Sequence, residues 1–175
     1  MRFRTLFAGI GMMLLLVLAI PFSGVLADEA ATPDSAIPEP TGEVVREIVG
    51  SSNPDEAPGE ILELSRYTIP AGAVLPVHRH PGDQMAMVLS GTLTYHVISD
   101  GSVAIVRADG TVETGEPGDT LTFTTGDSWV EPEGMVHWAQ NLTDEPIVLL
   151  SASLFEDGVP AASVVEATPV ATPAA

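Results

Sequence analysis

The segment Gly72–Gly91, with the sequence GAVLPVHRHPGDQMAMVLSG, decides the fold of this chain of 175 residues. At its centre stands His78-Arg79-His80, followed by a Pro-Gly-Asp turn. In a β-strand, residues i and i+2 point to the same face, so His78 and His80 would share one face while Arg79 faces the other way. In a helix, the two imidazoles would diverge by about 200°. The segment therefore predicts a strand that brings two imidazoles to one point. After the turn, Gln84 would start a second strand and could reach the same point.

A second segment, Gly126–Asn141 (GDSWVEPEGMVHWAQN), contributes His137 after a turn built by Pro132 and Gly134. The two segments together hold three of the four histidines in the chain. If their strands are neighbours in a barrel, three imidazoles and one amide oxygen converge. Nitrogen-rich sites of this kind suit iron, manganese, nickel, copper or zinc rather than calcium or magnesium. The predicted metal ligands are His78, His80, Gln84 and His137.

The two segments resemble the paired motifs of the cupin superfamily. The residues at the spacings of the first motif are Gly72, His78, His80, Gln84 and Gly91. Those at the spacings of the second motif are Gly126, Pro132, Gly134, His137 and Asn141. The resemblance covers roughly residues 60–155, with one copy of each motif. It implies an all-β, single-domain fold, the double-stranded β-helix (the cupin or jelly-roll barrel). It also implies a bound divalent transition metal and a small-molecule ligand or substrate.

The chain departs from the family at Gln84, where cupins usually have Glu. Three alternatives stay open: Gln84 coordinates through its amide oxygen, it leaves a three-histidine site similar to those of some non-haem oxygenase cupins, or the site has decayed. The functional hypothesis is an exported metal-binding cupin, either a non-haem metal-dependent oxygenase or a related enzyme acting on a small organic molecule. The alternative is a non-catalytic binder of a small ligand or of the metal. Whether the chain is an enzyme is left open, with Tyr95 as the candidate polar catalytic group.

Four further polar residues are interpreted as structural or solvated side chains. His96 lies outside both motifs and is interpreted as a structural or surface histidine. Asn141 is expected to fix a turn or to support a ligand from behind. Glu131 and Glu133 are interpreted as solvated loop charges of an acidic chain.

The rest of the domain alternates short β-branched runs with Gly, Pro and Asp turn signals, which is typical of an all-β sandwich or barrel. The predicted strands are Glu43–Val49, Ile61–Ile69, Val74–His80, Gln84–Ser90, Thr92–Ser99, Val103–Arg107, Thr111–Glu113, Thr120–Thr125, Met135–Gln140 and Ile147–Phe155. Strand parity adds a prediction about side-chain direction. If Gln84 points inward, Ala86 and Val88 share its face, whereas Met85 and Met87 point outward.

Composition excludes several functions. The formal net charge of −18 argues against nucleic acid and anionic membranes as partners. Two interpretations of this negative charge are that it keeps an exported protein soluble or that it forms an acidic binding surface. The chain has no cysteine, which excludes disulfides and thiolate ligands, and no lysine, which excludes Schiff-base chemistry.

The two ends of the chain differ from its middle. Residues 1–27 have the layout of a signal peptide, with an apolar run and a Val-Leu-Ala end, although an uncleaved anchor helix is the alternative. Cleavage would leave an extracellular, periplasmic or cell-envelope protein without stable membrane association. Residues 28–42 and 159–175 are Pro/Ala-rich and predict disordered segments, which places the barrel domain at 43–158. The family resemblance suggests a homodimer.

Overall fold

The computed structural model describes residues 37–166, and every regular element in this range is a strand. The range contains no helix that could cross a membrane. The strands form two antiparallel sheets, one of seven strands and one of five. In hydrogen-bonded order, the larger sheet contains β1 (Val45–Ser52), β2 (Glu60–Ile69), β11 (Ile147–Glu156), β4 (Gly82–Ser90), β9 (Ser128–Glu131), β6 (Val103–Val106) and β7 (Val112–Gly115). The smaller sheet contains β12 (Ser163–Val164), β3 (His78–Arg79), β10 (Val136–Gln140), β5 (Thr92–Ser99) and β8 (Thr120–Thr124).

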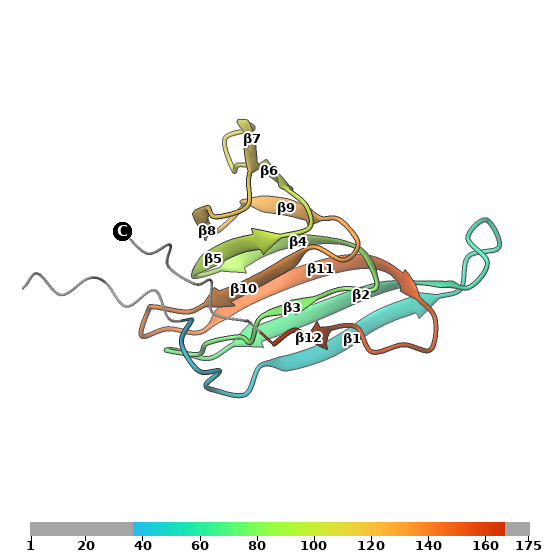
Figure 1. The fold of residues 1–175 in the computed structure, drawn as a ribbon, viewed down its shortest axis with the longest axis horizontal. Coiled ribbons are helices and arrows are strands. Elements are labelled where there is room, and N and C mark those ends of the chain that lie inside the picture. Colours follow the sequence, from blue (N-terminus) through green and yellow to red (C-terminus); the bar gives the residue numbers. More distant parts are fainter. Residues whose placement is uncertain (1–36, 167–175) are drawn as a thin grey trace, which may run out of the picture. The chain divides into compact units, whose positions relative to one another are not determined.

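Strands that are distant in the sequence are neighbours in these sheets (Figure 1). β11, near the end of the described range, lies between β2 and β4, and β10 lies between β3 and β5. Figure 1 shows β6 and β7 at one end of the larger sheet and β1 at the other. This exchange of early and late strands is the arrangement of a double-stranded β-helix, so the predicted all-β fold class is confirmed.

Alternating burial along β4 follows the predicted parity. Gln84, Ala86 and Val88 are buried, whereas Met85 is 55% exposed and Met87 is also exposed. The inward side chains of the two sheets pack into one core, whose fully buried members include Leu93, Val103, Ile105, Phe123 and Ile147. Burying one such side chain stabilises the fold by about 1.5–3 kcal/mol. The same inward face carries the polar residues of the site.

Two strands were not predicted. β9 was overlooked because it has only four residues, Ser128–Glu131, directly before Pro132. β12 has two residues within an Ala/Pro/Ser-rich stretch that shows no alternation.

β12 lies beyond residue 158, the predicted end of the barrel domain. Ser163 and Val164 pair with β3, and the Val165 amide donates to the Val77 carbonyl at 2.9 Å. At the other end, Thr41 bridges to Val74 within the segment predicted to be a linker. The predicted signal peptide (1–27) and the outer parts of both predicted disordered segments lie outside the described residues.

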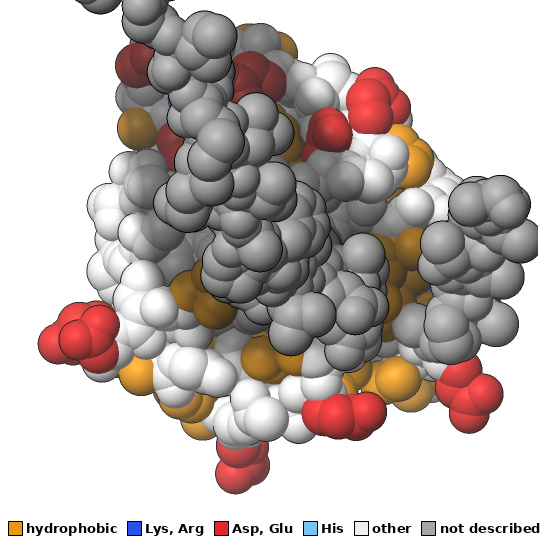
Figure 2. Space-filling model, turned by 60° about the vertical axis from the view of Figure 1, so that its left-hand side comes forward, with side chains coloured by type: hydrophobic (Ala, Val, Ile, Leu, Met, Phe, Trp, Pro, Cys, Tyr) orange, Lys and Arg blue, Asp and Glu red, His pale blue; other side chains and the backbone are white. Residues whose placement is uncertain are grey.

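The surface reflects the acidic composition. Figure 2 shows Asp and Glu side chains spread over one face, with hydrophobic side chains between them. Several of the arginines are paired with acids: Arg46 with Glu63, Arg66 with Glu47, and Arg107 with Glu113 and Asp127.

Candidate metal centre

Three histidines from both motifs come together on the inner face of the smaller sheet. His78 lies on β3 and is the register partner of His137 on β10, while His80 follows β3 directly. One ring nitrogen from each lies within 4.8 Å of the other two, and all three residues are buried. Arg79 is exposed, as the parity of the His-Arg-His triplet predicts.

The turn after His80 depends on a glycine. Gly82 has a φ of 152°, and a Cβ on it would lie 2.1 Å from the Leu154 carbonyl oxygen of the neighbouring β11. No other residue fits such a close approach between backbones. Gly82 therefore lets the chain pass from the two histidines of the smaller sheet directly into β4 of the larger one.

A backbone carbonyl orients each imidazole. The Nδ1 atoms lie 2.8 Å from Pro76 O for His78, 2.6 Å from Ala161 O for His80, and 3.2 Å from Met135 O for His137. A carbonyl oxygen can only accept, so Nδ1 carries the proton and donates it. The lone pair of each ring is then on Nε2, the tautomer that a metal-ligating histidine with such an outer partner adopts. The donor set fits a divalent transition metal.

Gln84 lies beside the histidines but presents its amide nitrogen to them. Gln84 Nε2 donates to Glu131 Oε2 at 2.8 Å and lies 3.1 Å from His80 Nε2. Its oxygen accepts a hydrogen bond from Ser153 Oγ at 3.4 Å. Exchanging the two amide atoms would bring the oxygen against the Glu131 carboxylate, which repels it. Coordination through the Gln84 amide oxygen, one of the alternatives that the sequence leaves open, would need the side chain to rotate.

The interpretation of Glu131 as a solvated loop charge was wrong. Glu131 is only 2% exposed and its carboxylate points into the histidine group. It accepts hydrogen bonds from Tyr95 Oη at 3.0 Å, Trp129 Nε1 at 2.7 Å and Gln84 Nε2 at 2.8 Å. The available sequence signal was the alternation of Trp129, Val130 and Glu131 before Pro132, which places Trp129 and Glu131 on one face of a short strand.

Burial and the charge of Glu131 shift the pKa values of the three histidines in different directions. Burial, with smaller contributions from the other two imidazoles, lowers the pKa of His78 to about 3. Burial also lowers the pKa of His137, although Glu131 opposes the shift. For His80, burial is outweighed by the hydrogen bond and charge of Glu131, so its pKa is raised. The pKa of Glu131 is lowered because the neighbouring imidazoles outweigh its burial, so Glu131 is ionised at neutral pH.

Tyr95, the candidate catalytic residue, lies at the edge of the histidine group. Its ring stacks on His137 with centroids 5.1 Å apart, and its hydroxyl donates to Glu131. Burial, followed by the Glu131 charge, raises the pKa of Tyr95 well above its ordinary value, so the hydroxyl stays protonated. The geometry therefore suits Tyr95 as a hydrogen-bond donor and not as a base.

The structural interpretations of His96 and Asn141 are confirmed. His96 stacks on Trp138 at 3.8 Å on the opposite face of β5 and β10 from the site. Asn141 is fully buried, and its amide nitrogen donates to the carbonyls of Ile69, Pro70 and Glu145.

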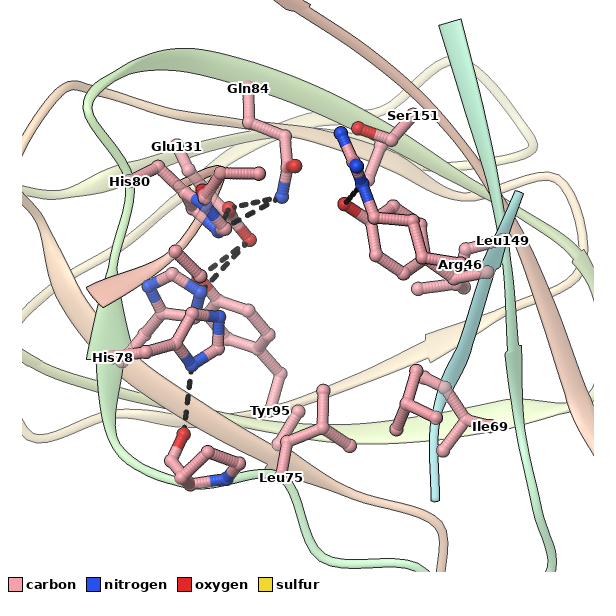
Figure 3. A pocket seen from close by; sticks show the side chains of 18 of the residues that line it. Arg46, Ile69, Leu75, His78, His80, Gln84, Tyr95, Glu131, Leu149 and Ser151 are labelled. Carbon is pink, nitrogen blue, oxygen red and sulfur yellow. Dashed lines mark hydrogen bonds and ion pairs between the residues drawn. The ribbon is translucent and has the colours of Figure 1, made fainter. Parts of the chain in front are cut away.

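The histidine group opens into a cavity of about 370 Å³. Figure 3 shows His78, His80 and Glu131 on one wall, with Arg46 and Ser151 on the opposite side. Most of the other lining residues are apolar, among them Ile69, Leu75, Leu93, Leu149 and Val164. A mostly apolar cavity with a few converging polar groups is typical of small-molecule sites.

Arg46 gives the cavity a second polar end. Its Nε donates to the Tyr67 hydroxyl at 3.0 Å, and its terminal nitrogen pairs with Glu63. Because a guanidinium has five donors, the contacts of Arg46 with residues 37–166 leave donors that a ligand could use.

The curated relatives of this chain include two germin-like proteins. Germin-like protein 5-1 of Oryza sativa subsp. japonica is 28% identical over 109 residues, which cover 60% of this chain and 43% of the relative. Germin-like protein subfamily 3 member 3 of Arabidopsis thaliana is 27% identical over 92 residues, which cover 52% and 37%. The chain thus spans less than half the length of either relative.

Among solved structures, an uncharacterized conserved protein with a double-stranded β-helix domain from Klebsiella pneumoniae has 21% sequence identity and a TM-score of 0.43. The match covers 75% of this chain and 91% of that one. The family model for cupins matches residues 30–166, a range that includes both motifs and all twelve strands. The chain that carries this histidine group is therefore a member of the cupin family.

Proposed function

We propose that this protein is a metal-dependent cupin enzyme, a non-haem metal-dependent oxygenase or a related enzyme that acts on a small organic molecule. The observation that carries the proposal is the convergence of three buried imidazoles, each fixed through Nδ1, at the wall of a cavity. His78, His80 and His137 would hold a divalent ion of iron, manganese, nickel, copper or zinc. Such an ion, when bound, polarises a substrate oxygen or activates dioxygen.

The protein's own groups would bind and orient the substrate. The apolar side chains of Ile69, Leu75 and Leu149 favour a molecule with an apolar body and exclude water around it. Arg46, on the side opposite the histidines (Figure 3), and Tyr67, which hydrogen-bonds to it, can hold a second polar group of the substrate. The cavity volume of about 370 Å³ lies at the lower end of the range for ligand sites, so the substrate would be small.

A non-catalytic binder is the second candidate function. It is favoured by Gln84, whose amide nitrogen faces His80 where cupins usually offer a carboxylate from that position. Oxygen uptake and product formation with the metal-loaded protein, measured over a panel of phenols, diketones and thiols, separate the two functions. Turnover that disappears on chelation supports the enzyme. Saturable ligand binding without any product supports the binder. If the fully metal-loaded protein shows neither turnover nor ligand binding over the panel, both functions are contradicted.

Export and dimerisation are further parts of the proposal. The signal-like layout of residues 1–27 supports export, and the test is whether the mature protein recovered outside the cytoplasm begins at Asp28.

The outer face of the larger sheet supports a homodimer. Leu64, Ala152, Met85 and Val130 are register neighbours on β2, β11, β4 and β9, so they form one apolar row across that face. Met85 is its most exposed large side chain. Large contiguous apolar patches on a protein surface mark interaction sites, and we infer that this row belongs to the dimer interface.

A further inference from the structure

We propose that Glu131 on β9 is the carboxylate ligand of the metal centre and replaces the one that the first motif lacks at Gln84. The centre would then consist of His78, His80, His137 and Glu131. This inference rests on the proposed metal site and goes beyond it, because it assigns the fourth ligand to a residue outside the motif positions.

Sheet register shows why the carboxylate can come from the neighbouring strand. Gln84 on β4 and Glu131 on β9 are direct partners in the antiparallel pair, and both are buried on its inner face. The Cβ atoms of such partners lie about 4.5–5.5 Å apart, which a Glu side chain can bridge. A carboxylate at position 131 can therefore reach nearly the same point as a carboxylate at position 84.

Glu131 lies close to two of the three histidines, at distances near those between ligands of one ion. Glu131 Oε2 lies 3.2 Å from His80 Nε2, and Glu131 Oε1 lies 3.6 Å from His137 Nε2. Two ligand atoms that are each about 2.1 Å from an ion, at octahedral or tetrahedral angles, lie roughly 3.0–3.4 Å apart. The Nδ1 protons of both rings are already donated to backbone carbonyls, so both Nε2 atoms offer lone pairs. The ligand atoms that all lie within 4.8 Å of one another belong to the three histidines alone, so Glu131 would turn toward His78 to join them on one ion.

Charge balance points the same way. In the described part of the chain, Glu131 pairs with imidazoles and with no arginine, although it is almost fully buried. An ionised buried carboxylate is costly unless a cation or several donors compensate it. Tyr95, Trp129 and Gln84 stabilise it with three hydrogen bonds but bring no positive charge. A divalent ion with three neutral imidazoles and Glu131 would leave a local charge of one positive unit, and the buried carboxylate would have its counter-ion.

The test is calorimetric titration of the metal-free full chain with Co²⁺ or Mn²⁺. Glu131→Gln should weaken binding at least about tenfold, because a charged ligand becomes a neutral one. Glu133→Gln is the matched control, since it makes the same change two residues away at an exposed position, and it should bind like the wild type. The double variant Gln84→Glu/Glu131→Gln moves the carboxylate across the strand pair and should restore most of the lost affinity.

Binding by Glu131→Gln within about threefold of the wild type would overturn this assignment and leave the three-histidine site standing. Absence of specific binding by the wild type would overturn the proposed metal centre as well. If Glu131→Gln does not fold, a crystal structure of the metal-loaded wild type decides the matter. A Glu131 oxygen about 2.0–2.2 Å from the ion supports the assignment, and a separation beyond about 3 Å overturns it.

Discussion

A chain that ends at Gly158 is predicted to bind its metal about 10 to 100 times more weakly than a chain that ends at Glu166. Removing residues 159–166 takes away the Ala161 carbonyl, which accepts the Nδ1 hydrogen bond of His80 at 2.6 Å. It also removes β12, which pairs with β3 at His78 and Arg79. Two of the three proposed histidine ligands thus lose a neighbour that fixes them.

The magnitude follows from the outer hydrogen bond. Replacing the partner of a metal-ligating histidine costs about 10–100-fold in affinity, which equals roughly 1.4–2.7 kcal/mol. Pro160, Ala161, Ala162 and Val164 also line the cavity, so their removal opens it to water and weakens ion pairing inside. The loss should therefore lie toward the upper end of this range.

Calorimetric titration of both truncated chains with Co²⁺ is the assay, after thermal unfolding has shown that each chain folds. The chain ending at Glu166 is a matched control, since it lacks only residues 167–175 beyond the described range. Equal dissociation constants would refute the reasoning, because they would mean that the Ala161 carbonyl does not hold His80 in its binding orientation.

Three further predictions follow from the same contacts. Metal affinity should fall as the pH drops through the raised pKa of His80, because the proton on its Nε2 competes with the metal; calorimetry from pH 8 to 5 checks this, and a flat profile would contradict imidazole ligation. Tyr95→Phe removes a buried hydrogen bond to Glu131 and should lower the free energy of unfolding by about 1–3 kcal/mol in urea titrations; an unchanged midpoint would show that the bond contributes nothing. Met85→Glu should convert the proposed homodimer to monomers in analytical ultracentrifugation, whereas Val112→Glu, at the far edge of the sheet, should not; a Met85→Glu dimer would place the interface elsewhere.

The sequence was informative where a short-range pattern determines geometry. Strand parity predicts that His78 and His80 share one face, and the second motif singles out His137, which the structure pairs with His78 on the adjacent strand. The same parity correctly separated Met85 from Gln84.

Sequence reasoning failed where the contact is made by a short strand or by the backbone. Glu131 lies on a four-residue strand, so its alternation was too brief to distinguish it from a loop in an acidic chain. The role of Ala161 lies in its carbonyl, which any residue would supply, so no side-chain pattern could reveal it. The orientation of the Gln84 amide depends on Glu131 and Ser153, which come from two other strands.

Metal content is the measurement that tests the central claim most directly. The purified full chain, loaded with a divalent transition metal and dialysed to remove ions held by its acidic surface, should retain about one ion per chain by elemental mass spectrometry. The double variant His78→Ala/His137→Ala should lose that ion, and His96→Ala, which alters the histidine outside the site, should keep it. Equal metal content in the wild type and the double variant, or none in the wild type, would contradict a metal centre at these three histidines.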